Sequence, residues 1–167
     1  MDQRKTALIV GMAKSGIGAA KLLCRNGYRV IINDQKAQID GLEEALAGYS
    51  VENRLGEEPS SLLTGVDLLV PSPIIPMSTP FIAQAQEAGV EVVSEIELGY
   101  RYARADFVCI TGTNGKTTCT ALTGELFKAG GFHTFVLGNI GVAITEHAEE
   151  TRPGDVIVAE TAARQLE

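Results

Sequence analysis

Short apolar runs recur along the chain and are separated by glycine turns and by segments with helical periodicity. Continuous apolar runs are typical of strands that a parallel sheet buries on both faces. The predicted strands cover residues 6–10, 29–33, 66–70, 90–93, 107–110, 133–137 and 156–159. Because helical segments alternate with these strands, the pattern predicts an α/β fold with ligand sites at the carboxyl ends of parallel strands.

Helices are predicted from apolar residues that recur three or four positions apart. Ser94 and Glu97 have the spacing of a capping box, which marks the start of a helix that runs through Ala103. In a later helix, Leu122 and Leu126 share one face with Ala129. The predicted helices follow the turns at residues 11–18 and 111–118 and also cover residues 41–47, 79–88 and 94–103.

The length of 167 residues is enough for one full domain, or for a small domain and part of another. The first α/β unit closes near residue 104, so we predict one domain at 1–104 and a second that begins at 105 and continues to 167. With 45% hydrophobic and 21% charged residues, the composition is that of a folded globular protein.

The formal net charge of -7 argues against nucleic acid and anionic membrane as partners. A phosphate ligand must therefore be held by local groups. No apolar run reaches the ~20 residues of a membrane helix, and residues 1–6 lack the apolar stretch of a secretory signal. We therefore expect a cytoplasmic protein.

Cysteine and histidine give no sign of a metal or disulfide site. Cys24, Cys109 and Cys119 form no CxxC pair, so we predict three reduced and buried thiols. The two histidines, His133 and His147, are too few and too far apart in the sequence to suggest a metal cluster.

The strongest chemical signal is a glycine-containing loop between an apolar strand and a helix. Backbone N–H groups and the helix N-terminus can surround a phosphate there, Lys116 can reach the outer phosphates, and the Thr117 hydroxyl can ligate magnesium. The common GxxxxGK[ST] pattern would place glycine where Ile110 stands, and an ordinary turn with a surface lysine is the alternative. The predicted triphosphate-binding residues are Gly112, Thr113, Asn114, Gly115, Lys116, Thr117 and Thr118.

Glu160 ends the last predicted strand. A P-loop protein commonly carries an acidic magnesium contact at the end of such a strand, so Thr117 and Glu160 are the candidate metal ligands. The alternative is a carboxylate at the exposed end of a strand.

The first glycine turn, at residues 11–18, stands where a dinucleotide-binding fold holds a pyrophosphate, with Asp34 placed for a ribose hydroxyl. The GxGxxG spacing is broken by Ala13, so a nicotinamide cofactor is disfavoured against another diphosphate. These glycines can also serve only close packing of a helix on a strand. Ser72 and Asn139 follow further strands and can contact a ligand or simply form turns.

Taken together, these blocks resemble the Mur ligases of bacterial peptidoglycan synthesis, and within them the branch that adds D-glutamate. The likeness is carried by blocks in the same order and spacing across the chain: Ser15-Gly16, Ser72-Pro73, Glu95 to Leu98, Thr111 to Thr118, Gly138 to Gly141, and the terminal Gln165-Leu166-Glu167.

The resemblance implies a Rossmann-like parallel-sheet domain that binds the substrate's uridine diphosphate, followed by the start of a P-loop-type central ATPase domain. It implies ATP and Mg²⁺ as cofactors, with Lys116 as the catalytic residue. The substrates would be UDP-N-acetylmuramoyl-L-alanine and D-glutamate, joined through an acyl phosphate. The residues implied to face the UDP substrate are Ser15, Gly16, Asp34, Gln35, Lys36, Ser72 and Asn139.

The chain departs from the family pattern at two places. Ile74 stands where the family has glycine after Ser-Pro, and residues 161–164 stand where it has an aliphatic residue, two serines and an aromatic residue. Members of the family also continue well beyond this length. We therefore expect an N-terminal fragment that is inactive alone, with a central sheet of about three strands and an unpaired edge that offers a surface for self-association.

Three other functions remain open from the residues. The chain can belong to another Mur-type ligase, or to a Rossmann and P-loop nucleotide-binding module that acts in regulation. A dinucleotide oxidoreductase is disfavoured by Ala13 and by the lack of a candidate acid for hydride transfer.

Overall fold

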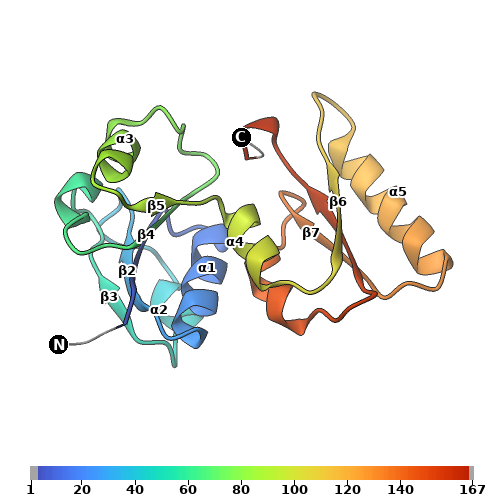
Figure 1. Ribbon diagram of the computed structural model, residues 1–167, viewed down its shortest axis with the longest axis horizontal. Coiled ribbons are helices and arrows are strands. Elements are labelled where there is room, and N and C mark those ends of the chain that lie inside the picture. The colour runs from blue at the N-terminus through green and yellow to red at the C-terminus, as the bar shows by residue number, and fades with distance from the viewer. Residues whose placement is uncertain (1–3, 166–167) are drawn as a thin grey trace. The chain divides into compact units, whose positions relative to one another are not determined.

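The computed structural model describes residues 4–165, and these form two compact α/β units. The first unit is Met1–Glu95 and the second is Ile96–Glu167 (Figure 1). Leu166 and Glu167, which end the Gln-Leu-Glu block of the family pattern, lie outside the described residues.

The first unit contains a five-stranded sheet in which every neighbouring pair is parallel. Its strand order, β3-β2-β1-β4-β5, makes β1 central and reverses the direction of winding beside it. This is a Rossmann-like arrangement, and its crevice lies at the carboxyl ends of the central strands. The strands are β1 (Thr6–Val10), β2 (Arg29–Asn33), β3 (Val51–Asn53), β4 (Leu68–Pro71) and β5 (Glu91–Val92).

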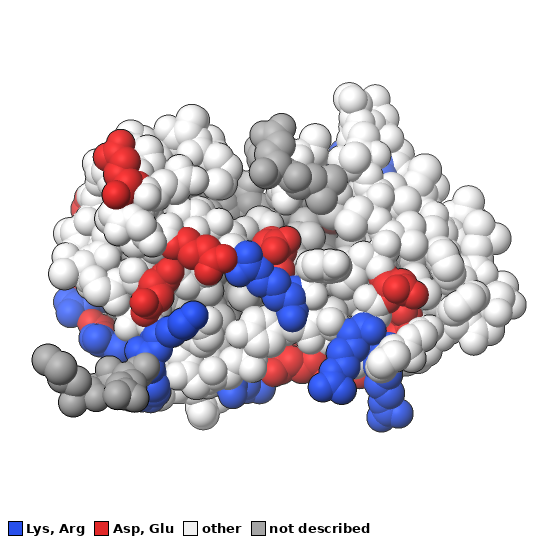
Figure 2. Space-filling view, in the orientation of Figure 1, with Lys and Arg blue, Asp and Glu red and all other residues white. Residues whose placement is uncertain are grey.

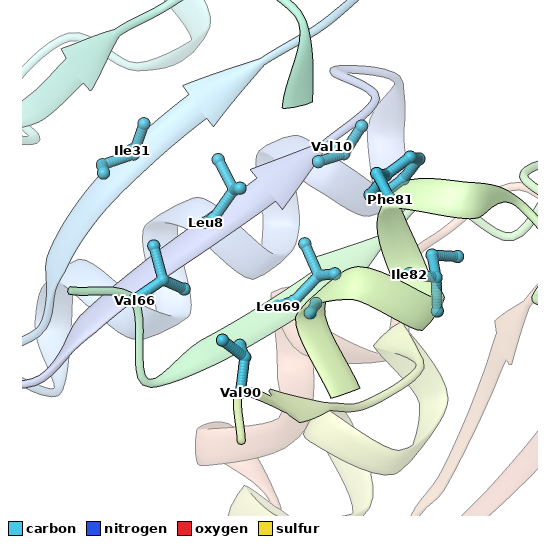
Figure 3. Close-up of a cluster of buried hydrophobic side chains, with 9 residues drawn as sticks. Leu8, Val10, Ile31, Val66, Leu69, Phe81, Ile82 and Val90 are labelled. Atoms are coloured by element: carbon cyan, nitrogen blue, oxygen red, sulfur yellow. The ribbon is translucent and has the colours of Figure 1, made fainter. Parts of the chain in front are cut away.

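Helices flank this sheet, and α3 covers one end of its apolar face. Leu8 and Leu69 from the central strands pack with Phe81 and Ile82 of α3 (Figure 3). Each of these side chains is at least 93% buried, which is worth about 1.5–3 kcal/mol per residue. The core therefore holds the carboxyl ends of the central strands in place, where a ligand site is expected in this fold. The helices are α1 (Lys14–Arg25), α2 (Leu42–Ala45) and α3 (Pro80–Glu87).

The second unit has a three-stranded parallel sheet of order β6-β8-β7, so its last strand lies in the middle. All five residues of β8 are buried. The number of strands agrees with the expected sheet of about three, and the edge strands β6 and β7 each pair with β8, while Gly138 of β7 also forms an isolated antiparallel bridge with Val142. The elements are α4 (Glu95–Tyr102), β6 (Asp106–Ile110), α5 (Lys116–Ala129), β7 (Thr134–Gly138), α6 (Ile144–His147) and β8 (Val156–Glu160).

The apolar stripe of α5 does not face the sheet. Leu122 and Leu126 are 59% and 65% exposed, whereas Thr120 and Gly124 are buried. A Cβ on Gly124 would lie 2.4 Å from the Val136 side chain, so the helix packs on β7 through its smallest residues. The periodicity correctly placed Leu122 and Leu126 on one face of the helix. The opposite face is buried, because only small residues allow the helix to pack closely on the sheet.

Two cysteines are also more exposed than predicted. Cys119 lies on the exposed side of α5, and Cys109 is exposed on the edge strand β6, while Cys24 is half-buried. The prediction of buried thiols is wrong for Cys109 and Cys119, because each lies on an element with an uncovered side. Partial desolvation of its sulfur on the strand still raises the pKa of the Cys109 thiol, so this group is not an activated thiolate.

Two short elements, β3 and α6, were missed by the sequence analysis. β3 has three residues and α6 has four, which is too short for either periodicity to be recognised. Both are fixed by tertiary contacts: β3 pairs with β2, and Ile144 of α6 is fully buried beside Ile157.

Acidic and basic side chains are mixed over the face of the molecule shown in Figure 2. At the β2–β3 edge, Glu52 accepts hydrogen bonds from Arg29 and from Arg54, and Arg54 also pairs with Glu57 at 3.3 Å. Across the described residues, no helix combines the length and the apolar character needed to cross a membrane.

Replacing Glu52 by glutamine is expected to lower the free energy of unfolding by about 0.5 kcal/mol at pH 7, since the side chains of this pair are partly exposed. The hydrogen bond from Arg29, and then that from Arg54, holds the pKa of Glu52 below its ordinary value of 4.5. The stabilisation is therefore present above pH 4.5 and is lost as the pH falls through the lower pKa of the folded state. Denaturant unfolding at pH 7 and at a series of pH values below 4.5 measures this, with the exposed Glu87→Gln on α3 as the control. A loss that stays the same over the whole series contradicts it.

Candidate functional site

A cavity of about 520 Å³ opens at the carboxyl ends of β1, β2 and β4 in the first unit. This is the position at which a sheet of this topology binds its ligand. The cavity is lined by Val10, Gly11, Asn33, Asp34, Gln35, Gly56, Glu57, Glu58, Pro59, Ser72, Ile74, Ile75, Pro76, Thr79 and Phe81.

The glycine turn after β1 is packed too closely for larger residues. A Cβ on Gly16 would lie 2.1 Å from the carbonyl oxygen of Gly11, and a Cβ on Gly11 would lie 2.5 Å from the Ser72 Cβ. The Gly11 N–H donates to the Asn33 carbonyl at 2.8 Å, which closes the turn on β2. Close packing inside the turn and against Ser72 thus accounts for Gly11 and Gly16 without a ligand.

The Asp34 carboxylate holds the backbone on both sides of this crevice. Its Oδ2 accepts from the Met12 N–H at 2.8 Å, and its Oδ1 accepts from the Lys36 N–H at 3.1 Å. Asp34 therefore positions the glycine turn as well as lining the cavity.

The predicted uridine-diphosphate residues fall into three groups. Asp34, Gln35 and Ser72 line the cavity together with Gly11, a residue of the glycine turn. The other three candidates in the first unit, Ser15, Gly16 and Lys36, are not among the residues that line the cavity. Asn139 lies in the second unit, at the end of β7.

Asn33 is a site residue that the sequence analysis missed. Its side chain is fully buried, and Nδ2 donates to the Arg54 carbonyl at 2.7 Å and to the Glu57 carbonyl at 2.9 Å. These bonds tie the cavity wall at residues 54–57 to the end of β2. The sequence does contain a signal for this role, because an asparagine at the end of an apolar strand becomes buried and then needs hydrogen-bond partners.

Replacing Asn33 by aspartate is expected to lower the free energy of unfolding by about 2 kcal/mol, because a carboxylate cannot donate to two buried carbonyls. It should also weaken binding of a ligand in the cavity about fivefold, since the wall at 54–57 loses its tether. Denaturant unfolding and calorimetric titration with UDP measure the two effects.

The matched control is Asn53→Asp, because the exposed Asn53 uses only its Oδ1, as acceptor from the Leu55 N–H at 3.0 Å. An aspartate keeps that acceptor, so its stability should remain within about 0.5 kcal/mol of the original chain. Equal losses for the two substitutions would show that the Asn33 amide donors have no special role.

In the second unit, the loop between β6 and α5 is exposed at residues 111–115. Gly115 precedes the helix with φ of 75°, and the first turn of the helix contains no acidic residue. Thr117 and Thr118 are exposed in that turn. The loop therefore presents a helix N-terminus and two hydroxyls to solvent, an arrangement that suits an anion.

Lys116 bends back over this loop. Its Nζ donates to the Gly112 carbonyl at 2.8 Å and lies 3.4 Å from the Thr113 carbonyl. An ammonium group is thus held directly at the loop, and not extended into solvent as in a turn with a surface lysine.

Glu160 lies at the end of the central strand, between the ends of β6 and β7. It is in register with Ile110 and with Gly138, and only 6% of its surface is exposed. The alternative of an exposed strand end is therefore wrong. Among the residues that the structure describes, its Oε2 has no hydrogen-bond partner, and a buried carboxylate oxygen of this kind fits a cation ligand.

A magnesium site does not require a large cluster of protein ligands. No group of three or more His, Cys, Asp or Glu side chains suited to a metal occurs within the described part of the chain. Mg²⁺ is commonly held by one or two carboxylates together with phosphate oxygens and water. The donor set of Glu160 and the Thr117 hydroxyl therefore remains compatible with Mg²⁺.

Asn139 lies directly beside Glu160. Its backbone N–H donates to the Glu160 carbonyl at 2.9 Å, and its Nδ2 donates to Gln165 Oε1 at 2.7 Å. The same Gln165 oxygen accepts from the Ala162 N–H at 2.7 Å. Asn139 thus links the turn after β7 to the segment that follows β8.

These features define a Rossmann-like α/β protein in which polar side chains and glycine turns gather at the carboxyl ends of parallel strands. Residues 5–94 match the family described as Mur ligase MurD-like, N-terminal domain. The chain belongs to this Mur ligase MurD-like family.

Curated relatives extend the similarity through the second unit. The chain is 44% identical over 169 residues to UDP-N-acetylmuramoylalanine–D-glutamate ligase of Alkaliphilus metalliredigens, with 99% of this chain and 37% of the relative covered. The ligase of the same name from Alkaliphilus oremlandii is 45% identical over 170 residues, with the same coverage. The chain therefore spans 37% of the length of these relatives.

Solved structures show the same fold at low sequence identity. The UDP-N-acetylmuramate:L-alanyl-gamma-D-glutamyl-meso-diaminopimelate ligase from Neisseria meningitides has a TM-score of 0.58 at 15% identity, covering 96% of this chain and 55% of that one. A pseudomurein peptide ligase type C from Methanothermus fervidus has a TM-score of 0.55 at 20% identity, covering 96% of this chain and 33% of that one.

Proposed function

We propose that this chain is the nucleotide-binding part of a UDP-N-acetylmuramoylalanine–D-glutamate ligase, an ATP-dependent enzyme of peptidoglycan synthesis. The observation that carries the proposal is the 44% identity to such a ligase across 99% of the chain. Both candidate sites lie inside that matched length. The proposed domains are 1–104 for the UDP substrate and 105–167 for the start of the ATP-binding domain.

In the first domain, the cavity at the ends of β1, β2 and β4 would take the UDP end of UDP-N-acetylmuramoyl-L-alanine. Asp34, Gln35 and Ser72 support this role because they line the cavity. Ser15 and Gly16 lie in the first turn of α1, where helix N–H groups can receive a phosphate.

In the second domain, the loop 112–118 would hold the phosphates of ATP. The geometry in favour is an exposed helix N-terminus with Lys116 Nζ held over the loop. Thr117 and Glu160 would hold Mg²⁺, which when bound would offset negative charge on the phosphates. The burial of Glu160 Oε2, which has no hydrogen-bond partner within the described residues, supports that assignment.

The chemistry explains why one protein would need two nucleotide sites. A carboxylate is a poor acyl donor, so the muramoyl-alanine carboxylate must first take the γ-phosphoryl group, with ADP leaving. The D-glutamate amine then attacks the acyl carbon and phosphate leaves. The task of Lys116 in this scheme is to stabilise charge on the transferred phosphoryl group.

Calorimetric titration of the chain tests the proposal. We expect separate binding of UDP-N-acetylmuramoyl-L-alanine and of ATP with Mg²⁺, and no competition between the two ligands. Tight binding of NADH that displaces the UDP substrate would overturn the proposal in favour of a dinucleotide enzyme.

A further inference from the structure

The most exposed of the large hydrophobic side chains in the described chain stands at the mouth of the first-unit cavity. Ile74 is 77% exposed and is one of the residues that line the cavity. Met77, three residues further along the same loop, is 49% exposed but does not line it. An exposed apolar side chain at the rim of a concave site offers area that a ligand can cover.

The loop holds Ile74 in a defined place. The Ser72 N–H donates to the Val10 carbonyl at 2.7 Å, and the Ile75 N–H donates back to the Ser72 carbonyl at 2.9 Å. This is a β-turn with Pro73 second and Ile74 third. No non-glycine residue described in the chain has positive φ, so the turn is not the type II form that glycine at the third position favours. The Ile74 side chain is therefore carried by a turn anchored to the end of β1.

The wall around Ile74 is apolar. Ile75, Pro76 and Phe81 also line the cavity, Ile75 packs against the cluster that contains Phe81, and Phe81 lies near Val10 at the carboxyl end of β1 (Figure 3). Together with Ile74 they give the cavity apolar side chains that suit contact with the face of a flat ring.

The remaining lining has acidic groups and no cation. Asp34, Glu57 and Glu58 contribute carboxylates, of which Glu57 pairs with Arg54, and neither lysine nor arginine is among the lining residues. Carboxylates accept hydrogen bonds from ring N–H and sugar hydroxyl groups, but they repel phosphate. The cavity thus favours the uncharged base and ribose of a nucleotide over its phosphates.

We propose that Ile74 is a ligand-contact residue that packs against the nucleotide base in this cavity, so that the base and ribose enter while the phosphates stay outside it. This inference rests on the proposed function of the first domain.

The test compares UDP and inorganic pyrophosphate as probes for the chain and for two variants. Ile74→Ala should weaken UDP binding about fivefold, because the base loses an apolar contact on one side. Pyrophosphate affinity should stay unchanged because this probe has no base. Met77→Ala is the matched control, and its UDP affinity should equal that of the original chain.

Ile74 and Met77 are both exposed, so both variants should fold, and their thermal unfolding midpoints confirm this. Equal UDP affinities for the original chain and Ile74→Ala would overturn the Ile74 contact while leaving the proposed UDP site intact. Failure of the original chain to bind UDP would overturn the Ile74 contact together with the proposed function of the first domain. A loss of pyrophosphate affinity equal to the loss for UDP would also overturn the base contact.

Discussion

The Lys116→Ala chain is expected to bind ATP with Mg²⁺ about 100-fold more weakly than the original chain. A hydrogen bond from an ammonium to a charged phosphate contributes about 1.5–3 kcal/mol, and the upper part of this range corresponds to roughly a 100-fold change. Lys116 Nζ already lies over the loop, 2.8 Å from the Gly112 carbonyl. Little reorganisation is therefore needed for it to reach a bound phosphate. Calorimetric titration at fixed Mg²⁺ measures the effect.

Lys128→Ala is the matched control, because Lys128 is on the same helix and pairs with Glu125 Oε1 at 2.8 Å. Its removal changes the net charge equally but touches no part of the loop. If Lys116→Ala and Lys128→Ala bind ATP equally well, the loop 112–118 is not a triphosphate site. UDP affinity should remain unchanged in both variants, since the proposed UDP cavity lies in the first unit.

The parallel sheets were predictable because their signal is local. The run that became β1 is apolar after Thr6, and the run that became β2 is apolar between Arg29 and Asn33; both are bounded by turns, and their bounds were predicted correctly. The position of β8 in the middle of its sheet was not predictable from periodicity, since strand order depends on contacts between distant segments. For the same reason β3, with three residues, was recognisable only from its pairing with β2.

The candidate sites divide in a similar way. The glycine loops and the carboxylates at strand ends could be predicted from the sequence, because residues that bind ligands in such folds directly follow an apolar strand. Asn33 was missed because its function is to hold backbone carbonyls more than 20 positions away. The burial of Glu160 was also not predictable, since it depends on β6 and β7 covering both sides of β8.

Gly138→Ala is expected to lower the free energy of unfolding of the second unit by about 4 kcal/mol. Gly138 has φ of 94°, and an added Cβ would lie 2.4 Å from the carbonyl oxygen and 3.1 Å from the nitrogen of Glu160. These are backbone atoms of the central strand, so they cannot move aside as the end of a flexible side chain would. The same carbonyl accepts from the Asn139 N–H, and the substitution should therefore also displace Glu160 and weaken binding of ATP with Mg²⁺.

Hydrogen–deuterium exchange of β7 and β8 under increasing denaturant measures the stability of this unit without interference from the first. Gly131→Ala is the matched control, because Gly131 has φ of 88° but an added Cβ would meet no atom within 4 Å. The free energy of unfolding of this variant should fall by only about 1 kcal/mol, because alanine is less stable than glycine in the left-handed backbone conformation. Equal losses at the two positions would mean that contact with the Glu160 backbone is relieved by a small shift of β7. The proposed metal residue would then not depend on the glycine beside it.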